Sequence, residues 1–441
     1  MTSDARNPSF LKSKLFWALV ASPVMALIAL VGVWFLGQLS LEKQLAALRA
    51  QGLPTTEYEL NNFYAVPEGT ADTTDLWVEA MDAVEFAGLS VRADGLPFLG
   101  HGPTPVPAPG EPWAELEASR TLLGELESEF QAIRTAAEAE GNVRFPGDFS
   151  LGVGPWQSHS TNSSDVLRLL QLDAHVSAHD GNHSQVLEDL RAIFALSDVI
   201  RDEPTLISQY MANAIHHVGC GAVVGFMPHC NWSDTELESL QTAIRSADFR
   251  HGVVNVLRGE RAICLTELDR QSLGPLRFWN KRESLPLFER AIDGISISWP
   301  EALSRQHELA APVVTDEISG FDRLTFGGVL PALWSVERAA SVGARADAMQ
   351  KCTVAAIAAE RFRLKHGRLP DSLAEIGQEF LGASEEPLNL MDPFDGQPLR
   401  FKSEKTRIII YSIGDNEQDD GGDYDDAEPP PPLDIGFLVK K

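Results

Sequence analysis

Residues 165–201, DVLRLLQLDAHVSAHDGNHSQVLEDLRAIFALSDVIR, decide the fold class of this chain. The stretch predicts two helices, Asp165 to His179 and Ser184 to Arg201. Asp180-Gly181-Asn182 lies between them and is typical of a turn, because glycine interrupts a helical pattern. Two helices joined by so short a turn lie antiparallel and side by side. The segment therefore predicts a helical hairpin.

The same alternation of helix and turn continues on both sides of this hairpin. Ser233 and Glu236 have the spacing of a capping box and predict a helix start. Further helices are predicted at 113–140, 204–226, 233–247 and 252–270. The sequence therefore predicts a mainly α protein with an all-α helical-hairpin domain over residues 113–335. A bundle and an irregular solenoid both remain open, because no strict repeat period is present.

The last hundred residues change character. A long helix from Val336 to His366 ends at Gly367. Strands are predicted at 399–402, 407–413 and 435–439, on either side of a loop rich in glycine and aspartate. Residues 336–441 are therefore predicted to form a small α+β module.

Several motifs in this module occur in a characteristic order. They are Lys365-His-Gly-Arg-Leu-Pro, Asp392-Pro-Phe-Asp-Gly-Gln-Pro-Leu, Tyr411-Ser-Ile-Gly-Asp-Asn, Gly421-Gly and Asp434-Ile435. In this order the module resembles the globular part of the major pseudopilin of type II secretion systems. The resemblance implies a calcium ion bound by the acidic loop. The ligands that it implies are Asp415, Asn416, Asp419, Asp420 and Asp423.

The composition of this loop also favours calcium without the resemblance. No Lys or Arg occurs from Ile408 to Val439, although many Asp and Glu residues crowd there. Calcium binds 6–8 oxygen ligands on flexible loops, and the glycines at 414, 421 and 422 would let backbone carbonyls turn inward. A solvated acidic segment is the alternative interpretation.

Residues 15–41, LFWALVASPVMALIALVGVWFLGQLSL, contain no charged side chain. A run of this length predicts a transmembrane signal anchor. Arg6, Lys12 and Lys14 precede it and place the N-terminus, residues 1–14, in the cytoplasm. The predicted location is the inner membrane, with the lipid bilayer contacting residues 15–41 and the bulk of the chain outside the cytoplasm.

The N-terminal region of the chain lacks two features with which a true pseudopilin begins. Ser9-Phe10 replaces the Gly-Phe cleavage site, and no Glu interrupts residues 15–41. We therefore expect the chain not to be processed or polymerised as a pilin. As a whole it resembles uncharacterised membrane-anchored bacterial envelope proteins, with residues 42–112 as a stalk and a proline-rich linker.

The charge and the cysteines narrow the choice of partners. The formal net charge is −27, which argues against nucleic acid as a partner. Cationic partners or divalent metal ions suit such a chain better, and the alternative interpretation of this charge is solubility alone. The cysteines, Cys220, Cys230, Cys264 and Cys352, show no C-x-x-C spacing, and both disulfides and free thiols remain open.

Two groups of residues have the side chains of a transition-metal site. His175, His179 and His183 are spaced by four, but Gly181 favours a turn over a ligand-bearing helix face. The second group consists of His216, His217, Cys220, His229 and Cys230. Its apolar neighbours favour ordinary core. The glycines between Gly219 and Gly225 are interpreted as helix packing through small residues.

Three functions remain after these exclusions. The first is a non-enzymatic interaction or scaffold protein of the bacterial envelope, binding other envelope proteins, with a calcium-stabilised C-terminal module. The second is an extracytoplasmic enzyme with a site in segments 143–161 and 271–335, where Trp156, His159, Trp279 and Trp299 would line a pocket. The third is an accessory component of a secretion or pilus-like apparatus. The sequence contains no recognised catalytic motif.

Overall fold

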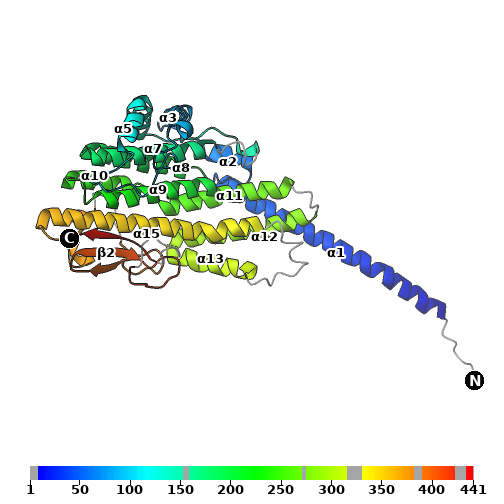
Figure 1. Cartoon of the computed structure of the whole chain (residues 1–441). Helices are drawn as coiled ribbons and strands as arrows, with labels where there is room; N and C mark the ends of the chain where they lie inside the picture. Colours follow the sequence, from blue (N-terminus) through cyan, green and yellow to red (C-terminus); the bar gives the residue numbers. More distant parts are fainter. Residues whose placement is uncertain are drawn as a thin grey trace, which may run out of the picture.

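A computed structural model describes residues 8–151, 158–270, 275–314, 330–381, 390–422 and 434–440. Helices in layers make up most of the molecule, and one small sheet covers the lower side of the long helix α15 (Leu330–His366) (Figure 1). The mainly helical architecture predicted from the sequence is confirmed.

The N-terminal part of the chain supplies α1 and the uppermost layer. Its helices are α1 (Pro8–Ala50), α2 (Glu57–Phe63), α3 (Thr74–Phe86), α4 (Leu89–Arg92), α5 (Leu116–Glu125) and α6 (Glu127–Glu138), followed by the 3-10 turn η1 (Phe149–Leu151). The single helix predicted over 113–140 is divided at Leu126. Leu126 leaves the helical conformation and is fully buried, and α6 turns its apolar side chains toward α3.

The helical hairpins form the middle of the molecule. They consist of α7 (Ser158–His179), α8 (His183–Arg201), α9 (Leu206–Phe226), α10 (Asp234–Arg245), α11 (Phe249–Arg270), α12 (Pro275–Ile297) and α13 (Trp299–Val314). The predicted capping box is present, since Ser233 and Glu236 bond each other's backbone N–H groups. Gly181 has a left-handed φ of 72° at the turn between α7 and α8, as its position in the hairpin requires.

The C-terminal residues form an antiparallel sheet against α15. Its strands are β1 (Arg400–Ser403), β2 (Arg407–Ser412) and β3 (Ile435–Lys440), in the order β1-β2-β3, and two 3-10 turns, η2 (Leu373–Glu375) and η3 (Gln378–Phe380), precede them. Ile410 pairs with Phe401 on one side and with Phe437 on the other. The three predicted strands are confirmed to within a residue or two.

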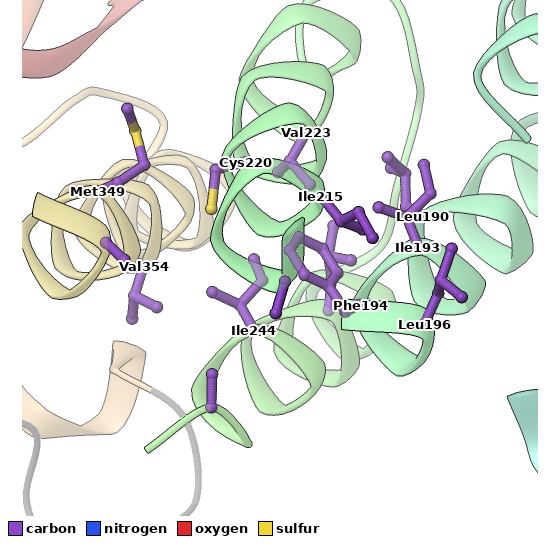
Figure 2. Packing of buried hydrophobic residues seen from close by; sticks show 14 of the residues in the cluster. Leu190, Ile193, Phe194, Leu196, Ile215, Cys220, Val223, Ile244, Met349 and Val354 are labelled. Atoms are coloured by element: carbon purple, nitrogen blue, oxygen red, sulfur yellow. The ribbon is translucent and has the colours of Figure 1, made fainter. Parts of the chain in front are cut away.

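One continuous hydrophobic core joins the hairpins to the sheet. Figure 2 shows its centre, where α9 packs between α8 and α15. Phe194 on α8, Ile215 on α9 and Val354 on α15 are all essentially inaccessible to solvent. Burying side chains of this size contributes roughly 1.5–3 kcal/mol each. The long helix α15 is thus held by apolar contacts on both sides.

The predicted transmembrane helix is the main correction to the expected fold. Within the described ranges, no helix combines the length and the apolarity that a membrane crossing requires. The predicted span over 15–41 and the predicted inner-membrane location are therefore wrong. Residues 15–41 lie within α1, and the end of this stretch packs against the protein itself: the rings of Trp34 and Phe278 are 6.3 Å apart, and Leu41 is buried beside α12.

Candidate functional site

A cavity of about 440 Å³ lies between the proline-rich segment, residues 101–112, and the helices α7 and α9. The segment contributes one wall, α7 contributes Gln171 and His175, and α9 contributes the floor. The residues that line it are Val106, Pro107, Ala108, Pro109, Gln171, His175, His217, Val218, Gly221, Ala222, Gly225, Phe226 and His229. Its surface is thus apolar, with a few uncharged or weakly basic polar groups.

Two glycines on α9 make room for this cavity. A Cβ atom added to Gly221 or to Gly225 would meet no other atom within 4 Å, and neither residue has a left-handed φ. Gly219 is different, because its Cβ would lie 2.9 Å from the ring of Phe194. The interpretation as helix packing through small residues therefore holds for Gly219, whereas Gly221 and Gly225 lie open on the cavity floor.

Two histidines of α7 contact the proline-rich segment and the aromatic residues that flank it. The His179 Nε2 atom lies 3.0 Å from the carbonyl oxygen of Pro107, and the His179 ring lies 5.2 Å from that of Trp113. The ring of His175 stacks on that of Phe98 at 5.2 Å. This part of the predicted linker is therefore a wall of the cavity, packed against the helical body.

His175 has a strongly perturbed pKa. Burial, reinforced by the nearby His179, lowers the pKa of His175 to about 4. Its Nδ1 atom is sealed from solvent and has no hydrogen-bond partner. The ring is only half-buried and lines the cavity, so its outer edge, which carries Nε2, meets the open space. The imidazole is uncharged at neutral pH.

The three histidines that are spaced by four in the sequence do not share one site in the structure. His175 faces the cavity and His179 holds the proline-rich segment, whereas His183 begins α8 and its Nδ1 accepts a hydrogen bond from the backbone N–H of Asn231. No three His, Cys, Asp or Glu side chains come together as a metal centre would need, within the ranges that the structure describes. The sequence-based preference for an inter-helix turn around Gly181 agrees with this arrangement.

The second histidine and cysteine group is divided between core and cavity. His216 is buried between the rings of Phe194 and Phe249, at 5.2 and 5.0 Å, and burial holds the pKa of His216 well below its usual value. Cys220 is a fully buried free thiol in the same core (Figure 2). His217 and His229 line the cavity instead. Cys230 is a buried free thiol outside this cavity. The core interpretation is therefore right for His216 and Cys220.

The predicted calcium ligands lie on the exposed loop that follows β2. Asp415 pairs with Arg345 of α15 at 2.9 Å, and the hydroxyl of Tyr411 donates to Asp419 at 2.9 Å. The side-chain amide of Asn416 donates to Asp420 at 2.7 Å. These four residues thus have protein partners instead of converging on one point, and Asp423 lies outside the described residues. Calcium binding at this loop stays a prediction.

Positive charge reaches the acidic loop from other elements. Arg345 comes from α15, and Lys402 of β1 lies 3.3 Å from the carbonyl oxygen of Gly421. The backbone N–H of Gly422 donates to the buried Asp434 at 2.7 Å. Arg345 therefore compensates the charge of Asp415 from a distant element, which the sequence of the loop alone could not reveal.

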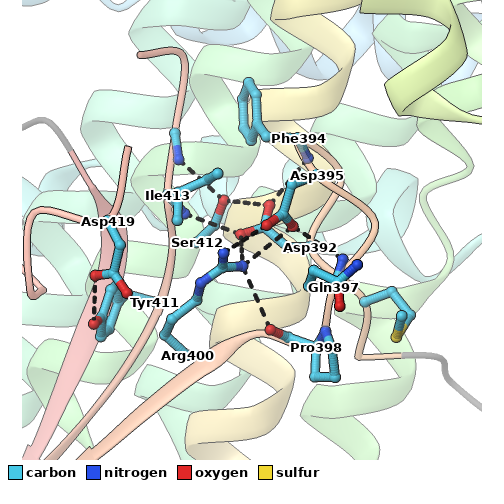
Figure 3. Close-up of polar contacts among 12 residues, drawn as sticks. Asp392, Phe394, Asp395, Gln397, Pro398, Arg400, Tyr411, Ser412, Ile413 and Asp419 are labelled. Carbon is cyan, nitrogen blue, oxygen red and sulfur yellow. Dashed lines mark hydrogen bonds and ion pairs between the residues drawn. The ribbon is translucent and has the colours of Figure 1, made fainter. Parts of the chain in front are cut away.

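A buried carboxylate connects the Asp392–Gly396 turn to the end of β2 (Figure 3). Asp392 accepts hydrogen bonds from the hydroxyl of Ser412 at 2.8 Å and from the N–H of Ile413 at 2.9 Å, and pairs with Arg400 at 3.0 Å. The sequence indicated a turn here but not this cluster. Because every oxygen of Asp392 has a partner and the residue is buried, the cluster stabilises the sheet and is not a candidate site.

A second polar cluster has the residue types of a hydrolase but not the arrangement. His159 lies 2.7 Å from Glu203, and the hydroxyl of Ser208 donates to the same carboxylate. In a catalytic triad the histidine must accept the proton of the serine, with the carboxylate on its far side. Here Glu203 lies between them and all three side chains are buried. The arrangement does not activate Ser208.

Of the residues of the predicted enzyme pocket, His159, Trp279 and Trp299 are not among those that line this cavity. Trp299 is buried and donates its indole N–H to Asp347, and Trp279 lies on α12 beside Phe278. Trp156 lies outside the described residues. The cavity between 106–109 and α9 was missed because its two sides are far apart in the sequence. Comparison with known proteins adds no assignment: no family model, no curated protein and no solved structure matches the chain.

Proposed function

We propose that the protein binds a small molecule in the cavity between the proline-rich segment and α9, without catalysing a reaction. The volume of about 440 Å³ lies within the range of small-molecule sites, which extends over roughly 300–1,000 Å³. The surroundings also suit such a site, since apolar walls combine with a few polar groups and one strongly perturbed pKa, that of His175.

The observation that carries this proposal is the pair Gly221 and Gly225. Glycine in the middle of a helix is less stable than alanine by about 0.5–1 kcal/mol. A close neighbour or a left-handed φ would explain a glycine, and neither is present at these two positions. The missing side chains leave the cavity floor open, so the loss of helix stability is best explained by the space that it creates.

The lining favours binding over catalysis. No Ser, Thr, Cys, Lys, Asp or Glu is among the described lining residues, so the site lacks the usual nucleophiles and carboxylate bases. A general base works best with a pKa near the working pH, and His175, at about 4, is far from neutrality. His217 and His229 also line the cavity, but the described lining offers them no hydroxyl, thiol or amine to activate.

A fluorescence titration tests this function directly. The probe is N-phenyl-1-naphthylamine, an uncharged aromatic amine whose emission rises when it leaves water. We expect saturable binding of one probe per chain, weakened at least tenfold in Gly221→Leu, because the leucine side chain occupies the floor.

The matched control is Gly124→Leu on α5, where an added Cβ also meets nothing within 4 Å. This variant should bind the probe like the wild type. Equal binding by Gly221→Leu and the wild type, or no saturable binding by the wild type, would contradict the proposal.

A protein-interaction role is the second candidate, and the exposed apolar side chains of α1 favour it. Met25, Phe35 and Leu36 are each more than half exposed on α1. The N-terminal part of this helix extends from the body (Figure 1). The first partner to test is a second copy of the chain. Sedimentation velocity should show a dimer that Leu36→Gln abolishes and that Phe86→Gln, at an even more exposed apolar position on α3, leaves intact. A monomer throughout would rule self-association out.

A further inference from the structure

The charge state of the cavity limits the ligands that it can take. No Lys, Arg, Asp or Glu is among the described lining residues, so the ionisable side chains among them are His175, His217 and His229. His175, the histidine in the apolar part of the cavity, is neutral near pH 7. A charged ligand would lose its hydration without gaining a counter-ion, which is strongly unfavourable. The net charge of −27 further repels anions. The complementary ligand is therefore uncharged.

The walls favour a flat aromatic ligand. Phe226 of α9 lines the cavity, and Pro107 and Pro109 line it from the opposite wall. The imidazole of His175 is held between Phe98, stacked at 5.2 Å, and Phe226, edge-on at 4.9 Å. Aromatic rings gain roughly 0.5–1.5 kcal/mol from such contacts beyond the area that they bury.

The polar groups of α7 indicate what the ring must carry. Gln171 and His175 lie one turn apart and both line the cavity. The Nδ1 side of His175 is sealed, so Nε2 is the nitrogen available at the open edge. A neutral imidazole presents either an N–H or a lone pair there, and a hydroxyl group, which both donates and accepts, matches either tautomer.

We propose that the cavity binds an uncharged aromatic molecule bearing a hydroxyl group, with this hydroxyl hydrogen-bonded to the imidazole of His175. This inference rests on the proposed function, since it names the ligand class of the same cavity. It assigns His175 a role in specificity and assigns the glycines of α9 and the proline-rich segment a role in shape.

Equilibrium dialysis with naphthalene and 2-naphthol tests the inference at pH 7. Naphthalene is the more hydrophobic of the two, so a purely apolar cavity prefers it. We expect the wild type to bind 2-naphthol about tenfold more tightly, as one additional hydrogen bond allows. In His175→Phe this preference should disappear while naphthalene still binds, which shows that the cavity is intact.

Two further variants complete the design. His175→Gln restores a donor and an acceptor and should recover part of the preference for 2-naphthol, and His366→Phe, an exposed histidine on α15, should leave it unchanged. Equal affinities in the wild type, or a preference that persists in His175→Phe, would overturn the inference and leave the binding function standing. Failure of both compounds to bind would overturn the two together.

Discussion

The rings of His175 on α7 and Phe226 on α9 meet edge to face, with their centroids 4.9 Å apart. Both residues line the same cavity. The contact places an imidazole in apolar surroundings, and burial is the main reason why the pKa of His175 falls to about 4. The same apolar packing around His175 therefore forms part of the cavity and lowers the pKa of this residue.

This titration predicts acid sensitivity. The unfolded imidazole has a pKa of about 6.5, so below that pH the unfolded chain takes up the proton first. The contribution of His175 to the free energy of unfolding is fully present above pH 6.5 and is lost as the pH falls toward 4. Between pH 7 and pH 5 the wild type should lose about 2 kcal/mol more stability than His175→Phe. Urea unfolding at the two pH values measures this difference, and equal losses in the two proteins would refute it.

Alanine substitutions at two glycines of α9 should change the stability of the protein in opposite directions. Gly219→Ala places a methyl group 2.9 Å from the buried ring of Phe194 and should destabilise the protein by about 1–3 kcal/mol. Gly221→Ala meets no neighbour and should stabilise it by about 0.5–1 kcal/mol through helix propensity. Thermal unfolding of the two variants gives both signs. A destabilised Gly221→Ala would mean that this glycine is needed for packing.

These glycines also show what sequence could and could not provide. The hairpin around Gly181 follows from local rules, because a turn between two apolar-faced helices needs only its own residues. The fate of Gly219, Gly221 and Gly225 depends instead on whether α8 or the proline-rich segment lies opposite each one. Which element lies opposite each glycine is decided by the tertiary fold. The stretch 219–225 therefore contains both a packing contact and a cavity floor, although its local sequence does not distinguish the two.

Replacing one carboxylate oxygen of the buried Asp392 by an NH₂ group should destabilise the protein strongly. In Asp392→Asn the new NH₂ group would face donors, namely the Ile413 N–H and Arg400, and Arg400 would lose its buried partner. We expect a loss of about 3 kcal/mol. Asp395→Asn, at a partly exposed carboxylate that also pairs with Arg400, should lose about 1 kcal/mol or less. Similar losses in the two variants would show that burial of Asp392 is not decisive.

The acidic loop predicts a response to calcium. A bound ion at a hundred times its dissociation constant adds about 2.7 kcal/mol, which should raise the melting temperature of the full chain by several degrees and be lost in Asp419→Ala. Asp371→Ala, an exposed carboxylate outside the loop, should keep the rise. Equal melting temperatures in calcium and in chelator would contradict calcium binding and leave the loop held by protein contacts such as those with Arg345 and Tyr411.

The predicted membrane span, which is wrong, and the predicted calcium loop, which stays a prediction, were both inferred from local composition. Residues 15–41 and the loop after Ile413 were each read from their own charges, one stretch having none and the other only negative ones. In the fold, Phe278 covers part of the first, and Arg345 compensates part of the second. Both partners are distant in sequence, and local composition cannot supply them.

The most direct measurement of the central claim is a crystal structure with 6-bromo-2-naphthol. The anomalous signal of bromine locates the ligand without reference to any assumed pose. The account predicts one strong peak between Pro107 and Gly221, with the naphthol oxygen within hydrogen-bonding distance of His175. A peak only on the exposed part of α1, or no peak at a saturating concentration of the compound, would contradict it.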